Sequence, residues 1–349
     1  MANGAMTVAT NLSEEERRLC GGLVEYRPST AWPVVLSAPH GGDLRPETVP
    51  DRTTGCSEPD WQSRELAEEV FRAFLAATPC LGPPALVVLA LHRCKLDANR
   101  ARRSAFEAAE ACDAGEAGLA WDAYHGSLEA ALRACVERFG FCLLLDLHGQ
   151  SHRAGVTELG YLLTSEDLLL ADADLEALAP PRPTCLTALL QAGVDGKGPR
   201  PGLAELVRGE RSLGGLLGVR GFRCTPSPEL PEPVLREALA AARANNADLK
   251  GAAGPPAASA EAATYFWGGY SARRYGASDT VPRECNPLPA EAQGGWARNV
   301  AAVQLETSWA GVREDADARR RFAEALRAAA LELLRDWRGW EPTEGSEAA

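Results

Sequence analysis

Two histidines and an aspartate crowd the end of one apolar run near the middle of the chain. Residues 141–145 are apolar without a break, and Asp146, His148 and His152 follow at once. Such a run is typical of a buried strand in a parallel sheet. Its polar end is then the carboxyl end of the strand, where open α/β sheets place their sites. We interpret the stretch as chemical; a structural strand whose histidines cap a turn is the alternative.

The other histidines fit the same pattern. His40, His92 and His148 each follow an apolar run directly, and Glu306 ends another run. If these strands are parallel, their carboxyl ends lie on one rim, so we expect the side chains to converge there. Two histidines and a carboxylate form a common catalytic zinc shell with an open position for water. The chain has no HExxH motif, and histidines that bond backbone groups at strand ends remain the alternative.

The overall charge excludes one class of function. The 349 residues carry a net charge of -12, whereas a protein that tracks nucleic-acid phosphates needs a basic face. Against this background, residues 93–103 hold five basic side chains and one acid, Asp97. This basic cluster indicates either a site for a small anionic ligand or the solvated start of a helix.

Cysteine spacing and hydropathy bear on the compartment. None of the ten cysteines forms a CxxC pair, so a zinc ribbon or a thioredoxin-type motif is not expected. The first twenty residues lack the basic and apolar regions of a secretory signal. No apolar run approaches the roughly 18–20 residues of a membrane span. We expect a cytoplasmic protein with reduced thiols and no membrane contact.

Apolar periodicity predicts strands and helices in alternation. We expect strands at residues 32–38, 85–91, 141–145, 159–163 and 299–306. We expect helices at residues 13–19, 119–138, 186–191, 203–217, 233–246 and 316–337, and one that opens at Asp60. In one interpretation Asp60 is only the N-cap of that helix. Strands that alternate with helices predict an α/β fold.

We expect residues 1–349 to form a single catalytic domain with a core at about 30–335. Residues 179–233 are rich in proline and glycine. We interpret them as an elaboration of the core and a candidate lid. Residues 251–263 are small and are expected to form a flexible connection.

Six short motifs, taken in order, resemble the N-formylglutamate amidohydrolases over roughly residues 30–335. They are SAPHGG (37–42), EPDW (58–61), LDANR (96–100), DLHGQSH (146–152), GGYSARRYG (268–276) and VQLE (303–306). That family consists of zinc-dependent enzymes related in fold to the metallocarboxypeptidases and to the aspartoacylase and succinylglutamate desuccinylase group. The resemblance implies a three-layer α/β/α fold with a central mixed, largely parallel sheet, phosphorylase/hydrolase-like and zinc carboxypeptidase-like.

The resemblance also implies a metal centre with one Zn²⁺ per chain. His40 and His148 match the histidine ligands, and Asp60 matches the acid before the tryptophan, with Glu58 as the alternative carboxylate ligand. Glu306 resembles the carboxypeptidase-type general base. An acid in a surface salt bridge is the alternative for Glu306.

A substrate site follows from the same motifs. Asn99 and Arg100 resemble the pair that grips a substrate carboxylate in the wider superfamily. A guanidinium suits that task because it donates two parallel hydrogen bonds. Arg273 is expected to hold a second carboxylate, with Tyr270 lining the pocket.

Two aspartates are expected to support the site: Asp97 by orienting Arg100 or its loop, and Asp146 by supporting a zinc ligand. The chain departs from the family at Ala98, where an Asp-Leu-Asn-Arg pattern is usual, and at Gly149, where the bacterial form commonly has serine. These departures bear on the substrate more than on the metal chemistry.

The function expected from the resemblance is zinc-dependent hydrolysis of the N-acyl amide of a small acidic N-acyl amino acid. N-formylglutamate, cleaved to glutamate and formate, is the leading candidate. One alternative is a carboxypeptidase-like or N-acetyl or N-succinyl amino acid hydrolase. A non-catalytic protein that binds small anions is the alternative of another class. The oligomeric state is not predicted.

Overall fold

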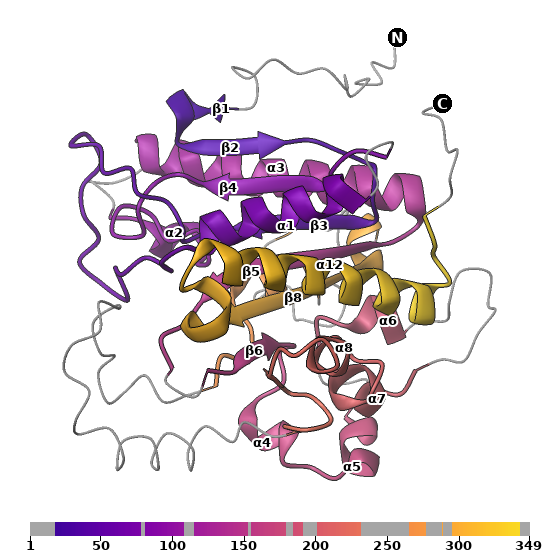
Figure 1. The fold of residues 1–349 in the computed structure, drawn as a ribbon. Coiled ribbons are helices and arrows are strands. Elements are labelled where there is room, and N and C mark those ends of the chain that lie inside the picture. Colours follow the sequence, from indigo (N-terminus) through magenta and orange to yellow (C-terminus); the bar gives the residue numbers. More distant parts are fainter. Residues whose placement is uncertain are drawn as a thin grey trace, which may run out of the picture.

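In the computed structural model, the described residues form one mixed sheet with helices on both faces (Figure 1). The described residues are 18–77, 81–107, 115–152, 155–178, 184–190, 201–231, 265–276, 288 and 295–342.

Four parallel strands form the centre of the sheet. They are β3 (Val34–Ala38), β4 (Ala85–Leu89), β5 (Cys142–Gly149) and β8 (Val300–Thr307), adjacent in the order β4-β3-β5-β8. Their residues are buried almost throughout because helices cover both faces, which explains the unbroken apolar runs. All four carboxyl ends therefore lie on one rim.

Short strands complete the sheet on both sides. On one side β2 (Val24–Arg27) pairs antiparallel with β4, and β1 (Arg18–Leu19) pairs antiparallel with β2. On the other side β6 (Thr157–Gly160) pairs antiparallel with β8, and β7 (Cys224–Thr225) pairs parallel with β6. The sheet is thus mixed but parallel at its core.

The long helices form the outer layers. In Figure 1, α1 (Ser63–Ala77) and α12 (Ala316–Arg338) lie in front of the sheet, and α3 (Glu116–Phe139) lies behind it. α10 (Tyr270–Gly276) packs on β8 and bonds α3 through Tyr275 and His125. The apolar stripe of α1 faces the core, with Leu66, Val70 and Phe74 fully buried.

The remaining elements are short. They are η1 (Cys20–Gly22), α2 (Arg102–Ala105), α4 (Ser165–Leu168), α5 (Asp172–Ala177), α6 (Thr187–Leu190), α7 (Leu203–Arg208), α8 (Leu213–Gly218), η3 (Trp296–Asn299) and the π-helical turn η4 (Trp309–Arg313). The described part of residues 179–233 contains α6, α7, α8 and β7. There α8 packs on α12, and α7 on α5 and α8. A lid role for this segment stays a prediction.

The three-layer α/β/α architecture with a mixed, largely parallel sheet is confirmed. Several local predictions were wrong. The strand expected at 159–163 ends at Gly160, because Leu162 has a positive φ of 63° and bonds Trp267 O instead. The expected helix at 203–217 is two helices, since Ser212 caps the second one.

The first strands of the chain were not foreseen. Arg18–Leu19, expected to be helical, form β1, and the partly buried β2 had too weak an apolar pattern to be recognised. The helix expected at 233–246 and the connection at 251–263 lie outside the described residues.

None of the helices in the described ranges combines the length and the hydropathy that crossing a membrane requires. Every cysteine that the structure describes is a free thiol.

Candidate metal centre

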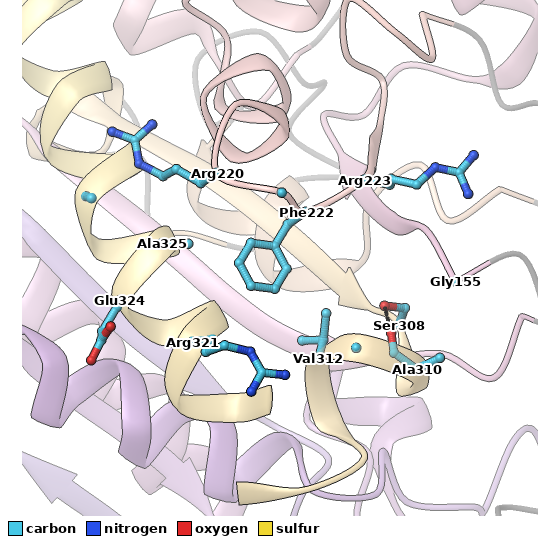
Figure 2. Close-up of a pocket in the computed structure, with 13 residues that line it drawn as sticks. Gly155, Arg220, Phe222, Arg223, Ser308, Ala310, Val312, Arg321, Glu324 and Ala325 are labelled. Atoms are coloured by element: carbon cyan, nitrogen blue, oxygen red, sulfur yellow. Dashed lines mark hydrogen bonds between the residues drawn. The ribbon is translucent and has the colours of Figure 1, made fainter. Parts of the chain in front are cut away.

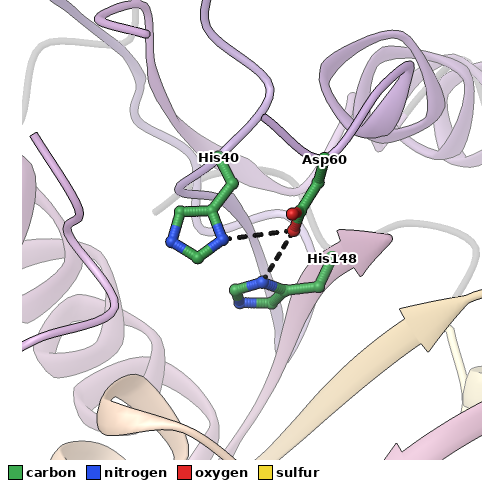
Figure 3. A group of neighbouring side chains, drawn as sticks. All are labelled: His40, Asp60 and His148. Carbon is green, nitrogen blue, oxygen red and sulfur yellow. Dashed lines mark hydrogen bonds and ion pairs between the residues drawn. The ribbon is translucent and has the colours of Figure 1, made fainter. Parts of the chain in front are cut away.

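Two histidines and one aspartate meet at the carboxyl rim of the sheet (Figure 3). His40 Nδ1 lies 3.1 Å and His148 Nδ1 3.0 Å from the same oxygen, Oδ2 of Asp60. One candidate ligand atom from each residue lies within 4.8 Å of the others, and all three residues are buried. The structure thus brings together the three side chains that the sequence motifs had singled out as ligands.

Strand ends and one loop position this group. His148 is the penultimate residue of β5, and His40 follows β3, the neighbouring parallel strand. Asp60 lies in the loop before α1, where its N–H donates to His40 O at 3.1 Å. The Asp60 carboxylate also accepts from Gly149 N at 3.1 Å. It therefore faces the histidines, and α1 begins only at Ser63, so Asp60 does not act as the N-cap.

The second ring nitrogen of each histidine meets another buried carboxylate. His40 Nε2 lies 2.7 Å from Asp97 Oδ1, and His148 Nε2 lies 3.1 Å from Asp146 Oδ2. Asp146 also accepts from Ser37 Oγ at 2.5 Å, because the two residues are in register across β3 and β5. Carboxylates that hold the outer nitrogen of a metal-binding histidine fix its tautomer and orientation.

The donor set fits a divalent cation. With a metal bound, each Nε2–H would donate to its outer carboxylate, Asp97 or Asp146, and each Nδ1 would offer a lone pair beside Oδ2 of Asp60. An unprotonated Nδ1 and an ionised carboxylate oxygen at these distances would repel each other, so this position requires either a proton or a metal ion. In a tetrahedral zinc shell with bonds of about 2.0 Å, ligand atoms are about 3.3 Å apart. The observed spacings of 3.0 and 3.1 Å are close to that value.

The charges of the group are strongly coupled. Burial alone lowers the pKa of an imidazole, but the charge and hydrogen bond of Asp146 and the bond to Asp60 hold the pKa of His148 well above its usual range. Burial raises the pKa of Asp60, yet His40 and His148 together hold it well below its usual range. In the absence of metal, His148 therefore carries a proton that a bound metal would displace.

Glu306 lies beside the group. It is the cross-strand partner of His148 in β8, and its Oε1 is 3.9 Å from His148 Nδ1. Burial raises the pKa of Glu306; His148 opposes this change, whereas Asp60 and Glu158 add to it. Gln304 donates to Glu306 Oε1 at 2.7 Å. Glu306 thus lies in the site and not in a surface salt bridge.

Arg93 links two of the acids. Its guanidinium lies 3.1 Å from Asp60 Oδ1 and 3.4 Å from Asp97 Oδ2. Burial lowers the pKa of Arg93, but the charges of both aspartates more than offset that effect. One member of the basic cluster therefore balances the acids of the centre and is not a solvated helix start.

Asn99 and Arg100, expected to bind a substrate carboxylate, already form some hydrogen bonds within the protein. Asn99 accepts from Ser271 N at 3.1 Å and donates to Gln304 at 3.4 Å, so it joins its loop to α10 and β8. Arg100 donates through Nε to Asp97 Oδ2 at 3.1 Å and is 42% exposed at its side chain. Gly269 is required here because a Cβ would overlap the Asn99 amide.

The two residues expected on α10 differ in their surroundings. Arg273 is half-buried, and its guanidinium lies over the Trp267 ring at 5.2 Å. Tyr270 is half-buried and accepts from Arg274 Nη1 at 3.0 Å, while Arg274 also pairs with Glu129 at 2.5 Å. Their contacts with a substrate stay predictions.

Three other candidates lie outside the metal group. His92, expected to converge with the others, instead accepts from Cys94 N and contacts Arg45. Its side chain therefore bonds to neighbouring loop residues and not to the metal group. The side chain of Glu58 is exposed, which favours Asp60 as the carboxylate. His152 is buried against Glu158 at 2.5 Å and stacks on Phe266 with ring centroids 5.2 Å apart, so it is not a solvated turn histidine.

A separate cavity lies between η4, α12 and residues 220–223 (Figure 2). Its volume is about 690 Å³, and Phe222, Val312 and Arg321 are among the residues that line it. None of the candidate ligands lines this cavity, nor does Glu306. The metal group is therefore a buried cluster at the strand ends, and the cavity is not where the metal chemistry would occur.

Sequence patterns missed four residues that shape the centre: Ser37, Arg93, Gln304 and Arg313. The first three had a local signal, because each lies within or next to a motif. Ser37 opens SAPHGG, Gln304 belongs to VQLE, and Arg93 directly follows a strand-end histidine. Arg313 had no such signal.

Comparison with known proteins finds similarity among solved structures and assigns no family. No protein-family model matches the chain, and no curated protein matches it. Among solved structures, it is similar to an N-formylglutamate amidohydrolase from Ralstonia eutropha JMP134, with a TM-score of 0.42, 14% identity and coverage of 90% of this chain and 97% of that one. It is also similar to gene product Atu2144 from Agrobacterium tumefaciens, with a TM-score of 0.41, 12% identity and coverage of 89% and 94%. Likeness at this level does not identify a substrate.

Proposed function

We propose that this protein is a zinc-dependent amidohydrolase that removes the acyl group from a small acidic N-acyl amino acid, with N-formylglutamate as the leading substrate. The observation that carries the proposal is the buried group of His40, Asp60 and His148 with Glu306 beside it. The six motifs described above support the substrate class. A non-catalytic anion-binding protein would not require a metal group with an acid next to it.

The centre offers three ligands to zinc: Nδ1 of His40, Nδ1 of His148 and a carboxylate oxygen of Asp60. When bound, the ion would supply a Lewis acid that makes water more acidic and polarises an acyl oxygen. Asp97 and Asp146 hold both imidazoles with Nδ1 toward the ion. His40 and His148 hold the pKa of Asp60 low, and the charge of Arg93 adds to their effect.

Glu306 is proposed as the proton carrier. It accepts a proton from the attacking water and delivers it to the departing amine, so one carboxyl group serves as base and then as acid. Gln304 fixes the Glu306 carboxylate by a hydrogen bond to Oε1, the oxygen that lies 3.9 Å from His148 Nδ1. The site then needs no further acid for the leaving group.

Arg100 and Arg273 are proposed to hold the carboxylates of the substrate. The terminal nitrogens of Arg100 remain for a ligand, since Asp97 engages only Nε. Fixing both ends of a dicarboxylic substrate orients its amide toward the metal, which accounts for a preference for acidic amino acids.

The first test concerns metal and proton transfer together. Purified protein is expected to contain one zinc per chain and to lose turnover with a chelator. In Glu306→Gln, zinc should remain while kcat falls by about 10²–10⁴-fold, the usual contribution of acid–base catalysis. A protein without stoichiometric zinc contradicts the proposal, and near-normal turnover in the variant removes Glu306 from the mechanism.

The second test concerns the substrate. Formyl, acetyl and succinyl derivatives of glutamate, aspartate and a neutral amino acid are assayed with the wild type, Arg100→Ala and Arg102→Ala. Arg102 is the matched control, because it lies in the same basic cluster but pairs with Asp122 at 2.8 Å. Arg100→Ala should raise KM for acidic substrates by about 10-fold or more, the scale of a lost charged hydrogen bond. Equal losses for neutral substrates contradict a carboxylate grip.

A further inference from the structure

One buried arginine joins three of the chain segments that form the centre. Arg313 ends η4, the π-helical turn that follows β8, and its side chain is only 2% exposed. The guanidinium donates to three backbone carbonyls: Nε to Thr307 O at 3.2 Å, Nη2 to Gln150 O at 2.6 Å, and Nη1 to Trp61 O.

Each of these three carbonyls belongs to a residue next to, or two positions from, a residue of the centre. Trp61 directly follows Asp60, Thr307 directly follows Glu306, and Gln150 lies two residues after His148. The guanidinium therefore fixes the loop that carries the carboxylate ligand relative to the strand ends that carry a histidine ligand and the proton carrier. Its three bonds act as one rigid fork, because guanidinium nitrogens are coplanar with fixed angles.

Gly149 provides the space for this fork. A Cβ at Gly149 would overlap the guanidinium carbon of Arg313. The N–H of Gly149 donates to Asp60 Oδ2 at 3.1 Å, so this residue lies between the carboxylate ligand and the arginine. Any side chain at this position would therefore displace the guanidinium.

The charge of Arg313 is unusual for its place. Within the described residues, no carboxylate lies within ion-pair distance of its guanidinium. Burying this charge carries a desolvation cost that lowers the pKa of Arg313, while the charges of Asp60 and Glu306 oppose that change. The three hydrogen bonds to carbonyls therefore hold the guanidinium in one fixed place.

We propose that Arg313 is a positioning residue that sets the spacing of Asp60, His148 and Glu306 and thereby the metal affinity of the centre. The inference deepens the proposed function and rests on it. Ala310, Gly311 and Val312 of the same turn line the cavity of Figure 2, whereas Arg313 is not among its lining residues.

Arg313→Lys tests the fork, since lysine keeps the charge but cannot reach three carbonyls in one plane. Zinc affinity is measured by competition with a chromophoric chelator, and the visible spectrum of the Co²⁺-loaded protein reports ligand geometry. We expect zinc affinity to fall by about 10–100-fold, the usual effect of losing support around metal ligands, and the cobalt bands to shift. Wild-type affinity with an unchanged cobalt spectrum overturns the inference.

Arg338→Lys is the matched control. Arg338 is also buried, at 8% exposure, and donates to a carbonyl, Ala188 O, at 3.1 Å; its guanidinium lies over Phe141, before the start of β5 and at the opposite end of that strand from His148. Both lysine variants should lower the melting temperature, whereas only Arg313→Lys should weaken zinc binding. Equal losses of affinity in the two variants would show a general stability effect and overturn the inference.

Gly149→Ala gives a second route that retains the arginine. Its Cβ displaces the guanidinium, so it should weaken zinc binding in the same direction, and this variant decides the matter if Arg313→Lys does not fold. Wild-type affinity in Gly149→Ala then overturns the inference. Failure of the proposed function is recognised separately, because the wild type itself would bind neither zinc nor cobalt.

Discussion

The two histidines of the centre are supported in different ways. Asp97, which holds His40, lies in the loop after β4 and receives Arg93, Arg100 and the N–H of Asn99. Asp146, which holds His148, lies within β5 and receives the Ser37 hydroxyl across the strand pair. We call the surroundings of Asp97 the loop side of the centre and those of Asp146 the strand side. Ionic contacts fix the carboxylate on the loop side, whereas strand pairing fixes the carboxylate on the strand side. A carboxylate on irregular backbone needs cations to fix it, whereas sheet hydrogen bonds already fix one on a strand.

The largest expected contrast is between Asp97→Asn and Asp146→Asn. Both variants should weaken zinc binding by about 10–100-fold, because each loosens one histidine ligand. Their stabilities should differ: Asp97→Asn withdraws the buried charge that Arg93 and Arg100 share and should cost about 3–5 kcal/mol, whereas Asp146→Asn should cost about 1–3 kcal/mol. Urea unfolding of the metal-free proteins measures both values. Equal costs would remove the distinction between a charged side and a strand side.

The loop side should also be the more sensitive to acid, through His125. This buried histidine donates Nε2–H to Ala98 O at 3.0 Å and accepts from Tyr275 at 2.8 Å, so it holds the loop beside Asp97 in its neutral form. Burial, with the charge of Arg274, holds the pKa of His125 well below its usual range. Below about pH 6.5 the unfolded chain then binds a proton that the folded chain does not.

Stability that depends on His125 is therefore present above about pH 6.5 and declines as the pH falls, by about 1.4 kcal/mol per pH unit. His125→Gln can keep the donor to Ala98 O without titrating, so its metal-free form should lose less stability between neutral and mildly acidic pH. The measurement is the urea midpoint as a function of pH. Parallel pH profiles for the two proteins would exclude His125 as a source of acid sensitivity.

The smallest expected effect is on the strand side. Ser37→Ala removes the hydroxyl that bonds Asp146 but leaves the strand register intact. It should cost about 1 kcal/mol of stability and reduce zinc affinity by less than about tenfold. Calorimetry of the metal-free and zinc-loaded protein gives both values. A loss as large as that of Asp146→Asn would mean that the hydroxyl, and not the register, holds this side.

The strand side was largely predictable from the sequence. The apolar run that ends in Asp146 and His148 predicted a buried strand, and its burial follows from helices on both faces. Positions two apart on a strand share a face, so Asp146 and His148, like Gln304 and Glu306, are directed together by local geometry alone. The register that places His148 opposite Glu306 was not readable, because it depends on how two distant strands pair.

The loop side was predictable only through its motifs. The LDANR motif suggested a site for a substrate carboxylate. In the structure, the Asn99 side chain and Arg100 Nε form hydrogen bonds within the protein instead. No local pattern indicated that Asp97 would reach His40, because the two residues come together only when the loops after β3 and β4 lie side by side. His92 was misplaced for the same reason, since its position after a strand said nothing of its side-chain direction.

The sequence by itself determined the α/β class and the residue types of the centre, because strand burial and ligand chemistry are written in local patterns. Only the tertiary structure decided which carboxylate faces the histidines, Asp60 and not Glu58, and which arginines hold the acids. Arg313 is the clearest case: it lies far along the chain from two of its three carbonyl partners. Contacts of that range arise from strand order and packing, which no neighbouring residues encode.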